Sequence, residues 1–125
     1  MAKAFKQRKV ALRKGHWRLP CDGLTWYVDL RSDGPGPAAR LRFEIGAWVD
    51  ALGQPEPEGG AVDCPLLHDL PLDTSGDEKA IAAEVDALVD RLHDADTVAG
   101  LARAWRDGEY AGALVDRDLR RLLEE

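Results

Sequence analysis

The stretch that decides the fold runs from Leu24 to Val49 and reads LTWYVDLRSDGPGPAARLRFEIGAWV. Its first and last parts alternate apolar and polar residues, which is the pattern of half-buried strands. The segment 31–40 between them is rich in glycine and proline and predicts a loop. The face expected to be buried carries Leu24, Trp26, Val28 and Leu30 from one strand, and Leu41, Phe43, Ile45, Ala47 and Val49 from the other.

The two strands are expected to pair antiparallel with Leu30 opposite Leu41. This register sets Asp29 opposite Arg42 on the polar face, where opposite charges attract. A slip of one residue would turn Trp26 from the core to the other side of the sheet. The hydrophobic pattern therefore predicts which face of each strand is buried, and with it the pairing.

Further strands are expected on both sides of this pair. His16 to Leu19 alternates polar and apolar residues, and the turn at 21–23 would fold it back as the hairpin partner of the first strand. Residues 61–70 predict a fourth, short strand, and Pro65 favours an edge position for it. Residues 15–70 thus predict an antiparallel meander sheet of about four strands.

The second half of the chain has a helical period. Ser75 and Glu78 have the spacing of a capping box, in which two side chains satisfy free amide donors at a helix start. The apolar stripe of the following helix consists of Ile81, Val85, Leu88, Val89 and Leu92. A second helix, capped by Asp94 or Asp96, is expected to end at Gly108.

A third helix is expected from about Asp116 to Leu123. Strands followed by helices, without alternation, indicate an α+β fold with two to three C-terminal helices, within 75–124, packed on one face of the sheet. The 125 residues are expected to form a single domain, since this length suffices to bury a substantial core.

The composition is that of a globular protein, with 45% hydrophobic and 32% charged residues. No apolar run approaches the roughly 20 residues that span a membrane, and the first residues lack the apolar core of a signal peptide. We therefore expect a cytoplasmic protein without a membrane partner. Cys21 and Cys64 are expected to be free thiols, and no nucleotide-binding signature suggests a cofactor.

Charge is segregated along the chain despite a net charge of only −6. Residues 1–20 hold seven cations and no acid, and residues 1–14 predict a basic arm or short helix. The arm is expected to dock on the protein's own acidic helices or on an acidic partner. Binding of nucleic acid by the arm is an alternative, which the acidic remainder of the chain disfavours.

Two chemical sites are conceivable from residue types. His16, Cys21, Cys64 and His68 together are the ligand set of a structural zinc site. Cys64 with His68 alone would form a thiol nucleophile and its base, as in a small enzyme acting on a small molecule or peptide. The simpler interpretation of the same residues is two loop histidines and two small buried thiols.

A binding surface is the third possibility. The face of the central hairpin opposite the core carries Tyr27, Arg42, Glu44 and Trp48, and aromatic residues on a polar face are typical of protein-binding patches. The same residues could instead be covered by the first helix or by the polar loop 53–60.

Several short motifs resemble a bacterial domain-of-unknown-function family, the one numbered forty-three-oh-four. They are the segments 14–18 (KGHWR), 26–30 (WYVDL), 42–46 (RFEIG) and 63–70 (DCPLLHDL), followed by a helical C-terminus. The resemblance covers about residues 11–107. It implies a fold more than a function, because the family has no agreed activity, and it brings no catalytic residues with it.

Taken together, these observations predict a small bacterial α+β protein that works as a non-enzymatic protein-binding module, accessory or immunity-like, as a monomer or homodimer. The missing catalytic signatures, the acidic surface and the aromatic residues on the polar sheet face favour this interpretation. The enzyme using Cys64 and His68 and the nucleic-acid-binding arm are the two alternatives.

Overall fold

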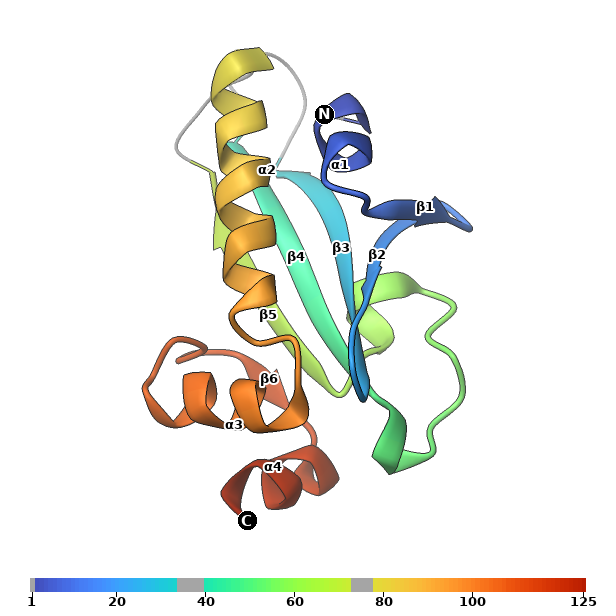
Figure 1. Cartoon of the computed structure of the whole chain (residues 1–125), viewed down its shortest axis with the longest axis vertical. Coiled ribbons are helices and arrows are strands. Elements are labelled where there is room, and N and C mark those ends of the chain that lie inside the picture. The colour runs from blue at the N-terminus through green and yellow to red at the C-terminus, as the bar shows by residue number, and fades with distance from the viewer. Residues whose placement is uncertain (1, 34–39, 73–77) are drawn as a thin grey trace.

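A mixed architecture of one sheet and four α-helices is seen in the computed structural model, which describes residues 2–33, 40–72 and 78–125 (Figure 1). The sheet is an antiparallel meander of six strands in the order β1-β2-β3-β4-β5-β6. The strands are β1 (Ala11–Arg13), β2 (His16–Pro20), β3 (Leu24–Asp33), β4 (Arg40–Val49), β5 (Leu66–Pro71) and β6 (Leu114–Val115).

The predicted α+β class and antiparallel meander are confirmed, but the prediction of about four strands is wrong. The two additional strands are the edges, β1 with three residues and β6 with two. An alternating pattern cannot be recognised over so few residues. Strand β5, expected at an edge, lies inside the sheet between β4 and β6, because the unpredicted strand β6 pairs with its outer side.

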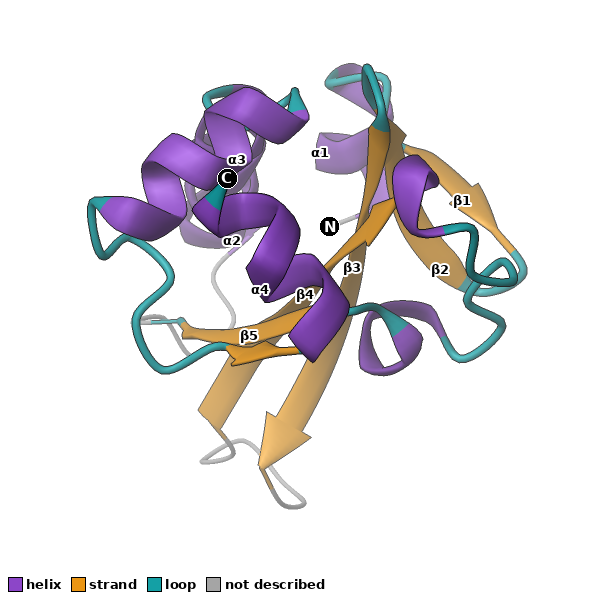
Figure 2. Cartoon of the chain, turned by 90° about the horizontal axis from the view of Figure 1, so that it is seen from below, coloured by secondary structure: helices purple, strands orange, loops and turns teal. Residues whose placement is uncertain are grey.

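The α-helices are α1 (Ala2–Gln7), α2 (Glu78–His93), α3 (Val98–Arg106) and α4 (Arg117–Glu124). Helices α2, α3 and α4 lie together on one side of the sheet (Figure 2). Two short 3₁₀ helices, η1 (Asp50–Leu52) and η2 (Gly60–Asp63), follow β4. No helix in the described part of the chain has the length and apolarity needed to cross a membrane.

The pairing of β3 with β4 differs from the predicted register by two residues. Leu30 lies opposite Phe43, and Asp29 lies opposite Glu44. An alternating pattern has a period of two, so a shift of two residues leaves every side chain on its predicted face. The pattern therefore predicted the buried face correctly but could not fix the register.

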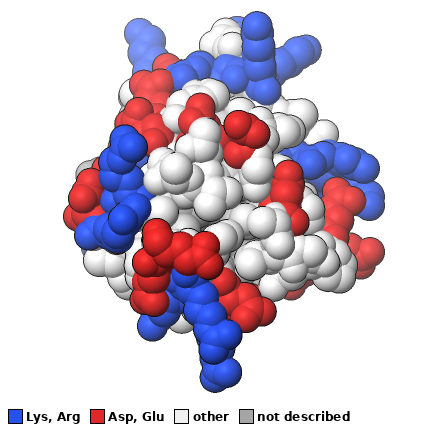
Figure 3. Space-filling view, turned by 60° about the horizontal axis from the view of Figure 1, so that its bottom comes forward, with Lys and Arg blue, Asp and Glu red and all other residues white. Residues whose placement is uncertain are grey.

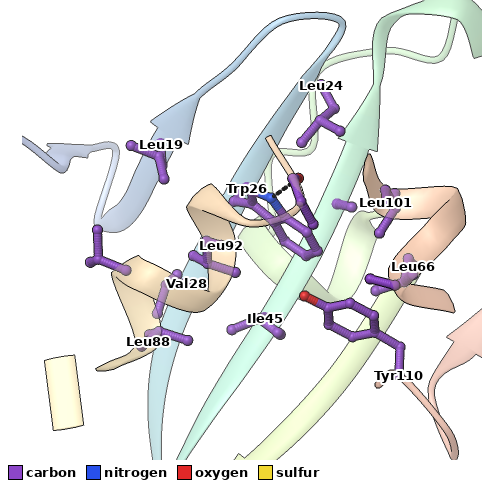
Figure 4. Packing of buried hydrophobic residues seen from close by; sticks show 14 of the residues in the cluster. Leu19, Leu24, Trp26, Val28, Ile45, Leu66, Leu88, Leu92, Leu101 and Tyr110 are labelled. Carbon is purple, nitrogen blue, oxygen red and sulfur yellow. Dashed lines mark hydrogen bonds between the residues drawn. The ribbon is translucent and has the colours of Figure 1, made fainter. Parts of the chain in front are cut away.

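The core lies between the predicted apolar face of the sheet and the helices. Trp26 is fully buried at its centre, and its ring stacks on Tyr110 with 5.7 Å between centroids. Its indole Nε1 donates a hydrogen bond of 2.9 Å to the carbonyl oxygen of Ala95 (Figure 4). Further core side chains labelled in the same view are Val28, Ile45, Leu66, Leu88, Leu92 and Leu101.

The N-terminal segment is part of this core. Phe5 of α1 is fully buried and stacks on Trp17 at 4.7 Å. Arg8, which follows α1, forms ion pairs with Asp86 at 3.1 Å and Asp90 at 2.6 Å on α2. The expectation that the basic arm docks on the protein's own acidic helix is thus confirmed for Arg8. Because these carboxylates are exposed and screened by solvent, the burial of Phe5 is the stronger attachment.

The helix predictions hold with one correction. Four members of the predicted stripe of α2 are buried, namely Val85, Leu88, Val89 and Leu92. Helix α3 is capped by Thr97 instead of Asp94 or Asp96, and the Thr97 hydroxyl accepts a 2.9 Å bond from the Gly100 amide. Residues 75–77 of the predicted capping box lie outside the described residues.

Candidate functional site

The outer face of the sheet, opposite the core, is partly covered by η2. Gly46 of β4 makes this possible, because a Cβ there would lie 2.7 Å from the carbonyl oxygen of Ala61 and 2.8 Å from Sγ of Cys64. Tyr27, Ala61 and Cys64 form a second, smaller buried cluster on this face. The η2 segment therefore rests directly on the backbone of β4.

This cover buries part of the predicted binding patch. Tyr27 and Glu44 are only 3% and 7% exposed, while Arg42 and Trp48 are half-buried. The indole of Trp48 donates a 3.1 Å hydrogen bond to the carbonyl oxygen of Pro55 in the loop after η1. Arg31 and Arg42 lie 3.3 and 3.9 Å from the Glu44 carboxylate. Tyr27 and Glu44 are thus buried, whereas Arg42 and Trp48 stay partly exposed, and Trp48 contacts the loop 53–60. A binding role for the four residues stays a prediction.

A buried carboxylate joins three elements on the same face. Asp29 Oδ1 lies 2.5 Å from Nδ1 of His16 on β2, and Asp29 Oδ2 accepts a 3.1 Å bond from the Ala61 amide of η2. This His16–Asp29 pair was missed in the sequence, where Asp29 was placed opposite Arg42. Trp17 lies opposite Val28 in the hairpin of β2 and β3, so the next pair is His16 and Asp29. Extending the predicted hairpin by this pair would have identified the contact.

A narrow crevice opens beside this pair. It is lined by Arg13, Lys14, His16, Arg18, Tyr27, Glu56, Pro57 and Glu58. Its free volume is about 10 Å³, which is room for about one water molecule. The Arg18 guanidinium lies 5.7 Å from the centre of the Tyr27 ring. Burial raises the pKa of the Tyr27 hydroxyl, an effect that Arg18 partly offsets.

Gly60 brings η2 against the His16–Asp29 pair. Its φ is +75°, and a Cβ there would meet both Nδ1 of His16 and Oδ2 of Asp29, the latter at 2.5 Å. Replacing Gly60 by alanine is therefore expected to lower the free energy of unfolding by about 2–4 kcal/mol, as strain and crowding add. Gly53 is the matched control, because its φ of +65° is also positive but open space surrounds it.

Urea unfolding of the two variants measures this difference. Gly53→Ala is expected to lower the free energy of unfolding by only about 1 kcal/mol, the cost of a positive φ without crowding. An equal decrease in the free energy of unfolding for both variants would mean that η2 is not in tight contact with the His16–Asp29 pair.

The predicted Cys64 and His68 dyad is not assembled. Cys64 belongs to the cluster under η2, whereas His68 packs edge-on against Tyr110 at 5.6 Å on the helix side of the sheet. Burial raises the pKa of the Cys64 thiol far above its usual range and lowers the pKa of His68. At neutral pH the thiol is therefore protonated, and it has no nearby base in His68.

The alternative zinc ligand set is not assembled either. His16 is bound to Asp29, and the Cys21 thiol faces the carbonyl oxygen of Leu19 at 3.4 Å. Burial raises the pKa of Cys21 to about 11. Within the described ranges, no three or more His, Cys, Asp or Glu residues are arranged to hold a metal ion.

A wider hollow shares the loop 54–58 with the crevice beside the His16–Asp29 pair. Its volume is about 460 Å³, and its lining residues are Gln54, Pro55, Glu56, Pro57, Glu58, Asp63 and Asp116. Two exposed apolar side chains neighbour these acids in the chain: Leu114 is 70% exposed, and Val62 is 46% exposed. We call the hollow together with Val62 and Leu114 the lower surface.

The residues of the lower surface come from several elements. Leu114 of β6 lies opposite Leu67 of β5, and Leu67 packs on the cluster that contains Ala61, the residue before Val62. Figure 3 views the lower end of the molecule and shows an uncharged area bordered by acidic and basic side chains. Nothing in the sequence pointed to Leu114, since β6 is too short to show a period.

Comparisons of the chain with protein-family models, with curated proteins and with solved structures find no match in any of the three. The resemblance to a domain-of-unknown-function family therefore stays a prediction.

Proposed function

We propose that the protein is a non-enzymatic protein-binding module of the accessory or immunity-like kind, and that its lower surface takes a basic segment of a partner protein. The observation that carries the proposal is Leu114, a large apolar side chain 70% exposed on an edge strand, two residues before Asp116, which lines the acidic hollow. The proposal keeps the predicted bacterial cytoplasm as its setting and leaves the monomer and homodimer as alternatives.

The chemistry of the lower surface defines the partner. Burial of a leucine side chain contributes about 1.5–3 kcal/mol, so Leu114 can serve as the central contact of a small interface. Glu56, Glu58, Asp63 and Asp116 surround the hollow with negative charge. Like charges gathered on one side attract a partner of opposite sign and speed its association. A lysine- or arginine-rich segment with one apolar side chain fits both features.

The two alternatives are less well supported by the side chains that they need. The enzyme requires a reactive Cys64, but that thiol is buried and protonated on the opposite sheet face from His68. Nucleic-acid binding requires a free basic arm, but α1 is anchored by Phe5 and Arg8 is occupied by two carboxylates of α2. The enzyme would therefore require exposure of the Cys64 thiol, and nucleic-acid binding would require release of α1 and Arg8 from the rest of the protein.

The test is capture of a partner, followed by measurement with purified components. The immobilised protein is incubated with lysate of the source cells, and each captured protein is purified and titrated against wild type and two variants. Leu114→Asp is expected to weaken binding by about 10- to 100-fold, because it places a charge in the interface. Leu12→Asp is the matched control, since Leu12 is also an exposed leucine (57%) on an edge strand, namely β1.

The control variant is expected to bind within about twofold of wild type. Raising the salt concentration should slow association, as expected for attraction between a basic segment and the acidic hollow. Binding that survives Leu114→Asp, or that both substitutions weaken equally, would exclude the lower surface as the binding site.

A further inference from the structure

The crevice beside the His16–Asp29 pair gathers basic groups from two neighbouring strands. His16 and Arg18 lie on the same face of β2, and Arg13 of β1 lies directly opposite His16. Lys14, in the turn between the strands, completes the rim. Three fixed positive charges and an imidazole thus line one small opening on the outer face of the sheet, together with the carboxylates of Glu56 and Glu58.

Arg18 is the central group of this opening. Its guanidinium lies over the ring of Tyr27, and its Nε is buried with no hydrogen-bond partner among the described residues. A guanidinium offers a planar fork of donors that matches the oxygens of phosphate, and stacking on an aromatic ring holds that plane in place. The folded chain therefore leaves one donor of the Arg18 guanidinium without a partner, in a side chain that lines the crevice.

A carboxylate of the protein already lies against one of these basic groups. Oε1 of Glu56 lies 3.8 Å from Nη1 of Arg13, and both side chains are about half exposed. Glu56 belongs to a short loop that begins after Gly53, with φ +65°, and ends before Gly59 and Gly60. The ion pair is long and solvated, so an external anion can replace the Glu56 carboxylate by rotation of that side chain.

We propose that this crevice binds a phosphate group, as in a phosphate monoester, with the Glu56 carboxylate as its internal substitute. Arg18 holds the phosphate with its guanidinium fork, and Arg13 and Lys14 supply the countercharge. The free volume of about 10 Å³ admits the ligand only after Glu56 moves outward, because it holds about one water molecule. The crevice shares Glu56, Pro57 and Glu58 with the hollow of the lower surface, whereas Arg13, Lys14 and Arg18 line the crevice and not that hollow.

Titration of the full chain with inorganic phosphate tests the proposal. The Nε–H signals of the arginines are followed by NMR at constant, low ionic strength. The Arg18 signal is expected to shift saturably, and Arg18→Lys should weaken binding by about tenfold because the fork is lost while the charge stays. Arg31→Gln is the control, since Arg31 lies on the same sheet face but pairs with Glu44 outside the crevice.

The control should bind phosphate within about twofold of wild type. Glu56→Gln, on an exposed loop and therefore compatible with folding, should tighten binding by about threefold or more. Acetate should bind about fivefold more weakly than phosphate at a pH above neutrality, where most of the phosphate is the dianion and acetate carries a single charge. A linear response without saturation, equal losses in Arg18→Lys and Arg31→Gln, equal affinity for acetate, or no gain in Glu56→Gln would each overturn the proposal.

Discussion

Replacing Trp26 by alanine is expected to lower the free energy of unfolding by about 3–5 kcal/mol, the range for truncation of large buried aromatic residues. The substitution removes the stack on Tyr110 and leaves a cavity at the centre of the core. It also leaves the Ala95 carbonyl oxygen without the hydrogen bond that it now accepts from the indole. Domains of this size are stable by about 5–15 kcal/mol, so the variant should be close to unfolding.

Trp48→Ala is the matched control for this prediction. Trp48 is half-buried on the outer face and donates one hydrogen bond to the loop. Its loss should cost less than that of Trp26, about 1–2 kcal/mol, since its side chain is only partly buried. Urea unfolding followed by circular dichroism gives both values. If the two losses were equal, Trp26 would not be the centre of the core.

Phe5→Ala is expected to have a comparable effect, about 3–5 kcal/mol, although Phe5 lies in the first turns of the chain. The phenyl ring is fully buried between Trp17 and Phe43, and it attaches α1 to the sheet. Lys6→Ala is the control, because Lys6 is the exposed neighbour and its removal should change stability by less than about 0.5 kcal/mol. Thermal or urea unfolding measures both. A Phe5→Ala variant as stable as wild type would mean that the N-terminal segment is a dispensable arm.

The sequence predicted the fold class and the buried faces because both depend on periodicity. Val28 and Ile45 lie on the core side as expected, and the stripe of α2 is buried where the spacing of three and four placed it. The register of β3 and β4 could not be predicted, since a shift of two residues preserves the same pattern. Edge strands of two or three residues carry no detectable period.

The candidate sites were harder to predict because they depend on contacts distant in the chain. Asp29 meets Ala61 across 32 positions, and no motif marks that contact. Its contact with His16 follows only when the register of the hairpin is extended by one pair. Tyr27 looked like a surface aromatic because its strand alternates, but η2 covers that face. Gly46 was the available signal, since a glycine inside a strand often marks a close approach of another segment.

The burial of Phe5 could not be predicted from the sequence either. It was one of very few apolar residues in a strongly basic segment, and such a segment has no continuous stripe to predict burial. The burial of Phe5 results from the tertiary position of Trp17 and Phe43, which the local pattern does not contain.

The most direct test of the proposed binding role is the footprint of a captured partner, measured by hydrogen–deuterium exchange on the purified complex. We predict slower exchange in η2 (Gly60–Asp63), in β6 (Leu114–Val115) and in the loop 54–58, with little change in α1 and β1. Protection confined to α1, β1 or α2, with the lower surface exchanging as in the free protein, would contradict the account.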